Sequence, residues 1–204
     1  MSDTLLAALI AALAAFLAAG FTVTGTIVFD RYKKFKDKNL ERISVLNALH
    51  ADLSTLNDVI IDRKSLIDRV PSSSPERPLT YLPISHNYFS VFDNFSTKVG
   101  LINNPGLIKQ VIRTYTEVKG LFDDVKSHGN NAVFLKNLLI NPPLNKEIID
   151  VVANGQLLML DNIVTNRVPQ TINQINDCIQ EINREKETIQ RNNNFSGFYK
   201  YLRQ

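Results

Sequence analysis

The chain has 204 residues, of which 44% are hydrophobic, and it carries a formal net charge of +3 at pH 7. Nucleic-acid-binding domains usually present a strongly basic face, so this mild charge predicts no nucleic-acid partner. The single cysteine, Cys178, excludes an internal disulfide. The length is sufficient for at least one domain with a hydrophobic core.

The first feature along the chain is an apolar stretch, residues 4–29, that contains no charged residue. About 20 apolar residues in a helix cross the hydrocarbon core of a bilayer, so this stretch predicts a transmembrane helix. A cleaved signal peptide is the main alternative, but it would have a basic start and an apolar core of about 7–15 residues. Residues 1–3 instead carry Asp3 and neither lysine nor arginine. A buried helix of a soluble protein is the remaining alternative.

Basic residues are concentrated in the segment that follows, residues 30–38. They are Arg31, Lys33, Lys34, Lys36 and Lys38. Cytoplasmic flanks of membrane spans are enriched in lysine and arginine, so residues 1–3 are expected outside and the rest of the chain in the cytoplasm. We therefore expect a single-pass protein of the inner (plasma) membrane, with the basic segment at the membrane surface.

Small residues recur at every fourth position of the apolar stretch, namely Ala7, Ala11, Ala15 and Ala19. Helices in lipid associate through close packing at small residues, so this spacing predicts homo-oligomerisation of the span. The alternative is that alanine serves only as apolar filler. Threonines 22, 24 and 26 add hydroxyls that can bond back to the helix or across to a neighbour.

Residues 39–192 predict a cytosolic, antiparallel helical bundle, so the expected fold class is all-α. Its first helix carries apolar residues in alternating steps of three and four, a pattern typical of bundles and coiled coils. These are Leu46, Leu49, Leu53, Leu56, Ile60, Ile67 and Val70, with Arg63 in the one remaining slot. Arg63 either binds a carboxylate or ligand in the bundle or extends to solvent at a helix edge. No residue between positions 29 and 39 is a helix breaker, so the membrane helix and the first helix of the bundle can form one continuous helix.

Prolines and serines in residues 71–78 predict a loop. We then expect a helix over about residues 85–100 with an aromatic face, and a longer helix that begins at Pro105 with Asn104 as N-cap candidate. Residues 128–131 (His128, Gly129, Asn130 and Asn131) are expected to end the longer helix. Residues 134–140 are expected to form a short, separate helical segment.

The last third of the chain, from Leu144 to about Asn192, is expected to be helical with a kink near Pro169, which lacks a backbone donor. A second stripe predicts a partner for the first helix. It consists of Ile172, Ile175, Ile179, Ile182 and Ile189, with Lys186 in the remaining slot. The tail, residues 193–204, mixes aromatic and basic residues. It is expected either at the bilayer surface or packed on its own bundle.

Sequence motifs for catalysis are missing: there is no phosphate-binding glycine loop, paired-cysteine motif or nucleophile elbow. The three histidines lie far apart, and Cys178 is expected to pack rather than react. We therefore expect no enzyme, no catalytic residue, no metal site and no cofactor. The candidates for ligand binding are cations near apolar faces, namely Arg63, Arg77, His86 and Arg113.

Residues 46–57 (LNALHADLSTLN), residues 99–121 with their mid-helix Tyr115, and the span with its basic flank carry a resemblance. The chain resembles a loose group of small prokaryotic single-pass membrane proteins with a cytosolic helical domain. Several of these proteins are linked to phage defence or stress, so the resemblance implies a membrane effector or sensor. We expect an oligomeric protein whose cytosolic bundle responds to a small-molecule signal or a cytosolic protein. The alternative is a passive anchor or scaffold that recruits a cytosolic partner protein.

Overall fold

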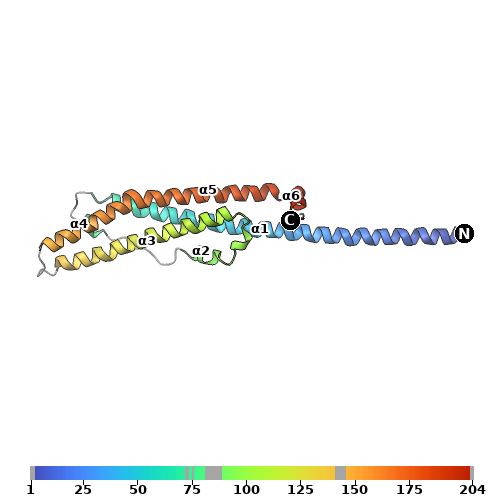
Figure 1. Ribbon diagram of the computed structural model, residues 1–204, viewed down its shortest axis with the longest axis horizontal. Coiled ribbons are helices and arrows are strands. Elements are labelled where there is room, and N and C mark those ends of the chain that lie inside the picture. The colour runs from blue at the N-terminus through green and yellow to red at the C-terminus, as the bar shows by residue number, and fades with distance from the viewer. Residues whose placement is uncertain (1–2, 72–73, 75, 81–88, 141–145, 203–204) are drawn as a thin grey trace. The chain divides into compact units, whose positions relative to one another are not determined.

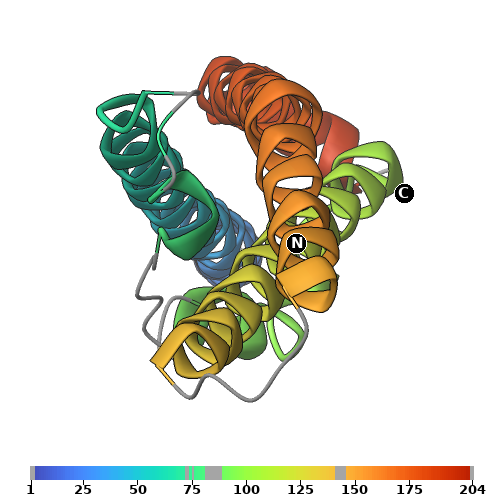
Figure 2. The ribbon, with the colours of Figure 1, turned by 90° about the vertical axis from the view of Figure 1, so that its left-hand side faces the viewer.

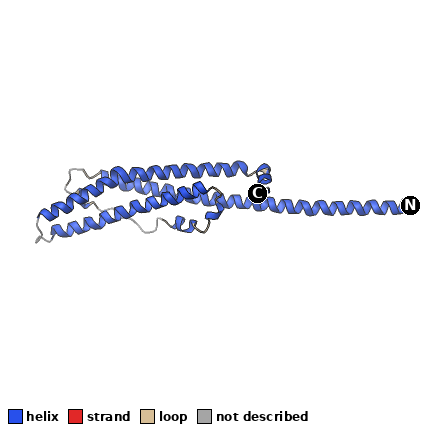
Figure 3. Cartoon of the chain, viewed as in Figure 1, coloured by secondary structure: helices blue, strands red, loops and turns tan. Residues whose placement is uncertain are grey.

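The structure, a computed structural model, describes residues 3–71, 74, 76–80, 89–140 and 146–202 (Figure 1). Of the residues that the structure describes, 91% lie in helices and none lies in a strand (Figure 3). The predicted all-α class is therefore confirmed. The long helices are α1 (Asp3–Asp68), α3 (Pro105–Ile140), α4 (Lys146–Asn162) and α5 (Val168–Asn192); the short elements are η1 (Arg77–Leu79), α2 (Ser90–Phe95), η2 (Val99–Leu101), η3 (Ile163–Arg167) and α6 (Phe195–Leu202).

The chain divides into two compact units. The first unit contains Met1–Ile43 together with Thr188–Gln204, and the second contains Ser44–Glu187. Helix α1 contributes to both units, because it extends from Asp3 to Asp68 without a break, and it is also continuous through residues 29–39. The sequence left this continuity open, and the absence of proline in the helix explains it.

The apolar N-terminal part of α1 is exposed. An 18-residue window of this helix has a mean hydropathy of 1.9 and no buried residue, so it is long and apolar enough to cross a membrane. The hydroxyls of Thr22 and Thr26 donate to the carbonyls of Ala18 and Thr22 at 2.8 and 2.9 Å, and that of Thr24 donates to Gly20. The three hydroxyls therefore bond back to their own helix.

In the second unit, the C-terminal part of α1 lies beside α3 and α5 (Figures 1 and 2). Six of the seven apolar residues of its predicted stripe are buried, and they are Leu46, Leu49, Leu53, Leu56, Ile60 and Ile67. Val70 is half-buried and lies beyond the end of the helix. Arg63 is half-buried and forms no ion pair with a described residue, so it reaches solvent at the helix edge.

The segment between α1 and α3 is less helical than expected. Of the predicted helix over residues 85–100, residues 85–88 lie outside the described ranges, and the rest contains only α2 and the 3-10 turn η2. Phe92 is half-buried and stacks on Tyr115 of α3, with ring centroids 4.3 Å apart. The aromatic face is therefore part of the core, and packing rather than helix propensity holds this segment in place.

Helix α3 begins as predicted and ends later than predicted. The Asn104 side chain caps its start, since Oδ1 accepts a hydrogen bond from the Leu107 N–H at 3.1 Å. His128 and Gly129 were predicted to end the helix, and this prediction was wrong, because α3 continues to Ile140. Both residues are buried in the middle of α3. The packing of neighbouring elements against this part of the helix outweighs the low helix propensity of glycine.

The last third of the chain accommodates Pro169 through a local change of helix type. Between α4 and α5 the chain forms one π-helical segment, η3, that immediately precedes Val168 and Pro169. A π-helical turn shifts the backbone hydrogen bonds by one residue, so the helix continues past the proline, which lacks a donor, at the position where a kink was expected.

The second apolar stripe was predicted with the wrong phase at two positions. Ile175, Ile182 and Ile189 are buried, but Ile172 and Ile179 are half-exposed. Thr171 and Cys178 are instead completely buried. Steps of four and three from Thr171 give the observed buried positions, so helix geometry outweighs residue type in choosing the inward face. This α4–α5 region also contains a window of mean hydropathy 1.3, of which 22% is buried. The α4–α5 region supplies Leu160, Ile163 and Val164 to the core of the second unit.

In the first unit, the aromatic tail packs on α1. The Phe198 ring of α6 is buried and lies 5.3 Å from the Tyr32 ring and 5.7 Å from the Phe35 ring of α1. Asn39 of α1 and Asn193 also share a side-chain hydrogen bond of 3.4 Å. The tail thus has a packing role of its own. All five basic residues of the adjoining segment are exposed on α1, and they are Arg31, Lys33, Lys34, Lys36 and Lys38.

Candidate functional site: a polar groove between α3 and α5

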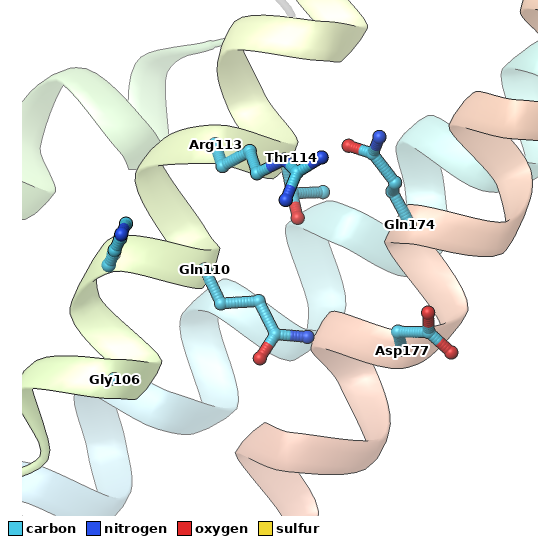
Figure 4. Close-up of a pocket in the computed structure, with 7 residues that line it drawn as sticks. Gly106, Gln110, Arg113, Thr114, Gln174 and Asp177 are labelled. Carbon is cyan, nitrogen blue, oxygen red and sulfur yellow. The ribbon is translucent and has the colours of Figure 1, made fainter.

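The most distinctive polar feature of the second unit is a groove of about 380 Å³ between α3 and α5 (Figure 4). Helix α3 lines it with four polar side chains in its first three turns, and helix α5 adds two from the facing side. The lining residues are Gly106, Lys109, Gln110, Arg113, Thr114, Gln174 and Asp177. Ligand sites in proteins are typically concavities of about 300–1,000 Å³ with a few convergent polar groups, and the groove falls within this range.

Helical spacing explains why these residues share one surface. Lys109 and Arg113 are four residues apart on α3, as are Gln110 and Thr114, so each pair lies on the same helix face about one turn apart. Thr114 is buried at the floor of the groove, whereas Lys109 and Arg113 are exposed at its rim. The Gln110 amide extends from α3 toward α5 (Figure 4).

The charged groups of the groove have no charged partner among the residues that the structure describes. Lys109, Arg113 and Asp177 form no ion pair with any residue in the described ranges. The Oε1 atom of Gln174 is buried and accepts no hydrogen bond there. A buried acceptor without a donor costs free energy, so Gln174 has an unfilled polar interaction beside the groove.

A polar contact in the core lies directly behind the groove. Tyr115, the residue after Thr114, is completely buried, and its hydroxyl donates to Oδ2 of Asp52 on α1 at 2.6 Å. Burial raises the pKa of the Asp52 carboxyl above its ordinary value, and the hydrogen bond from Tyr115 opposes that shift. Burial is also the largest cause that raises the pKa of the Tyr115 hydroxyl. The pair therefore connects the groove-lining helix α3 to α1.

Cys178 lies on the same inner face of α5 and is completely buried. Burial raises the pKa of its thiol to about 11, and the Glu181 carboxylate adds to the shift, while a hydrogen bond with Thr114 opposes it. A reactive cysteine needs an accessible thiolate with a lowered pKa. The observed thiol has the properties of a packing residue.

The four ligand candidates from the sequence do not converge. Arg113 lines the groove, and Arg63 lies on α1 away from it. Arg77 of η1 is buried, and its guanidinium donates to the Val70 carbonyl at 2.7 Å and to Asp161 of α4 at 3.2 Å. Arg77 therefore holds the end of α1 and α4 together. His86 lies outside the described residues.

His128, which was predicted to lie at a helix end, is another buried polar residue of the second unit. Its side chain is completely buried in α3, and neither ring nitrogen has a hydrogen-bond partner of normal geometry in the described ranges. Burial lowers the pKa of His128, and the Thr80 backbone and the Gln156 side chain oppose the shift only in part. The imidazole is thus neutral in the folded protein at pH 7.

Within the described ranges, no three histidine, cysteine, aspartate or glutamate side chains are grouped closely enough to hold a metal ion. The oligomerisation candidates Ala11, Ala15 and Ala19 are exposed on α1, and the side chain of Ala7 lies outside the described residues.

Most of the groove was missed by sequence reasoning, which selected only Arg113. Lys109, Gln110 and Thr114 lie near it on α3, so a search for polar residues at helical spacing would have found them. Gln174 and Asp177 lie about 60 residues further along the chain, and only the register of α5 against α3 brings them to the groove.

Comparisons with protein-family models, curated protein sequences and solved structures found no match. The resemblance to small prokaryotic membrane proteins therefore remains a prediction from the sequence.

Proposed function

We propose that this protein is an oligomeric, single-pass membrane protein whose helical domain binds a ligand and transmits the binding event through α1. In this proposal residues 4–29 cross the inner (plasma) membrane, residues 1–3 lie outside, and an antiparallel helical bundle lies in the cytoplasm. The alanines at positions 7, 11, 15 and 19 pack neighbouring copies together in the bilayer. The exposed basic residues of the segment 30–38 contact the cytoplasmic headgroups.

The continuity of α1 is the observation that carries the proposal. The same helix contains the exposed apolar window and the buried stripe that contacts α3 and α5. A passive anchor has no need of such continuity, because a flexible linker would serve equally well. A continuous helix can transmit a small rotation or tilt, since its backbone hydrogen bonds resist local deformation.

A contact route also connects the groove to α1. Thr114 lines the groove, and the adjacent Tyr115 donates its hydrogen bond to Asp52 of α1. A ligand that shifts α3 by a fraction of an ångström changes this contact first. The ligand can shift the equilibrium between the two arrangements of α3 and α1 only by the difference between its binding free energies for them.

Cysteine crosslinking in native membranes tests the proposal. Single cysteines replace the alanines at positions 11, 15 and 19 in a Cys178→Ala background, and crosslinking is expected to be strong at all three and weak at Leu13, on the opposite face. Bulk added to the alanine face by Ala15→Leu is expected to abolish the crosslinks, whereas Gly20→Leu, which adds one carbon more but on the opposite face, leaves them. A strictly monomeric protein, or crosslinking equal on both faces, contradicts the proposal.

The alternative, a passive scaffold, differs in one measurable respect. A scaffold recruits its partner whether or not α1 is continuous, so a flexible Gly-Ser insertion after Lys38 would leave partner recruitment intact. The proposed relay loses its ligand response with that insertion while the protein stays in the membrane.

A further inference from the structure

The α3–α5 groove shows which chemical groups its ligand carries. Lys109 and Arg113 are like charges four residues apart on one helix face, an arrangement that destabilises a helix unless an anion lies between them. Neither side chain has an acidic partner in the described ranges. By contrast, Arg167 on η3 contacts both Glu117 and Asp124 of α3, and Arg184 contacts Glu181. The two groove cations are therefore placed for an anion from outside the chain.

The opposite side of the groove requires hydrogen-bond donors from the ligand. The carboxylate of Asp177 accepts hydrogen bonds only, and the buried Oε1 of Gln174 lacks a donor. Both groups come from α5, while the two cations come from α3 (Figure 4). A ligand that spans the groove thus has an anionic end toward α3 and hydroxyl or amino groups toward α5.

The charge on the α3 side of the groove favours a phosphate ester over a carboxylate. Lys109 and Arg113 supply +2 on that side, while Asp177 supplies −1 on the α5 side, and a phosphate monoester carries a charge of about −1.5 to −2 near pH 7. A phosphate also offers three acceptor oxygens, which can engage a bidentate guanidinium and an ammonium group together. A carboxylate offers two oxygens and a single charge, so it leaves one of the cations unmatched.

We propose that the groove between α3 and α5 binds a phosphate monoester of a hydroxylated molecule, such as a sugar phosphate or a nucleoside monophosphate. Lys109 and Arg113 bind the phosphate, and the exposed carboxylate of Asp177 accepts hydrogen bonds from the hydroxyl groups beside Gln174. The buried Thr114 and the Gln110 amide line the space between them. This inference rests on the proposed function, because it names the ligand to which the domain responds.

The test is isothermal titration calorimetry on the full chain in mild detergent, with glucose 6-phosphate and AMP as probes. Binding of at least one probe is expected, with inorganic phosphate weaker and unphosphorylated glucose and adenosine without measurable binding. Lys109→Ala and Arg113→Ala are each expected to weaken binding by about 10-fold to 100-fold, the loss typical of a hydrogen bond to a charged group. Lys126→Ala removes an exposed lysine of α3 outside the groove and is expected to leave the affinity unchanged.

A lipid headgroup can carry the same phosphate monoester, so a second set of titrations separates the two sources. The full chain is placed in nanodiscs of phosphatidylcholine with and without phosphatidic acid, and the soluble probes are titrated again. If phosphatidic acid lowers the affinity for the soluble probes, and Lys109→Ala abolishes this competition, the groove binds a lipid headgroup. If the affinities for the probes are the same in both kinds of nanodisc, the groove binds a soluble ester. The inference is overturned if no phosphorylated probe binds in either setting, or if the unphosphorylated analogues bind equally well.

Failure of this inference and failure of the proposed function give different results. If the relay is wrong and the ligand class is right, the probes bind in the groove and the α1 crosslinks do not change. If the ligand class is wrong and the relay is right, none of the probes binds, while the crosslinks retain their face preference and respond to a ligand of another class.

Discussion

The hydrogen bond between Tyr115 and Asp52 gives a pH-dependent prediction for the variant Tyr115→Phe. The substitution removes one oxygen and keeps the ring, which stacks on Phe92 at 4.3 Å. Asp52 then remains partly buried without its donor. The loss of a hydrogen bond to a charged group costs about 1.5–3 kcal/mol, so we expect the free energy of unfolding to fall by this amount at pH 7.5.

The direction of the pH effect follows from the carboxyl group. The pKa of Asp52 is raised in the folded protein, so the native state binds more protons than the unfolded state between about pH 3.9 and that raised pKa. Stability therefore falls as the pH rises through this window. Removal of the Tyr115 hydroxyl raises the pKa further and extends the window upward. At pH 4.5, where a larger fraction of the carboxyl is protonated, the expected loss is smaller, about 0.5–1.5 kcal/mol.

Urea unfolding of the full chain in mild detergent, followed by far-UV circular dichroism at pH 4.5 and 7.5, measures both values. The matched control is Asp52→Asn combined with Tyr115→Phe, which removes the ionisable group as well. Its change in unfolding free energy relative to Asp52→Asn is expected to be the same at the two pH values. A loss for Tyr115→Phe that is equal at both pH values would refute the account of Asp52 as an ionised, partly buried group.

Two further predictions concern other buried positions. Because burial lowers the pKa of His128, the free energy of unfolding is expected to fall as the pH drops below about 6.5. In urea unfolding between pH 5 and 7, His128→Leu should remove this pH dependence. The matched control is His50→Leu at a half-exposed position, which should keep it. Gly155→Ala is expected to raise the unfolding free energy by about 0.5–1 kcal/mol, since a Cβ there has nothing within 4 Å. At Gly120 the same change gains less or nothing, because its Cβ would lie 3.1 Å from the Arg167 guanidinium, and equal gains at both glycines would contradict this.

The helices and much of the core could be predicted from the sequence, because they depend on local patterns. The stripe from Leu46 to Ile67 and the Asn104 cap were read from spacing and residue type, and both are confirmed. Local patterns failed where tertiary contacts decide. Gly129 lies inside α3 because surrounding elements cover it, and Thr171 is buried because the geometry of α5 turns it inward.

The groove could not be predicted, since it depends on the register between two helices far apart in the chain. A shift of α5 by one residue relative to α3 would turn Gln174 and Asp177 away from Arg113 by about 100°. Sequence periodicity gives the inward face of each helix and leaves the axial register undefined. That register is set by contacts such as Asn104 with Glu185 and Arg167 with Asp124, each between side chains distant in sequence.

The positions of Thr114 and Tyr115 lead to a last prediction about how binding and response separate. Adjacent side chains on a helix diverge by about 100°, so Thr114 contacts the groove while Tyr115 contacts α1. Tyr115→Phe leaves every groove side chain in place, so the affinity for a bound ligand is expected to change by less than about threefold. The ligand-induced change in crosslinking at position 15 is expected to be lost, since α3 no longer binds Asp52. If Tyr115→Phe weakens ligand binding and crosslinking response in equal proportion, the hydrogen bond only supports the fold and the relay runs through other contacts between α3 and α1.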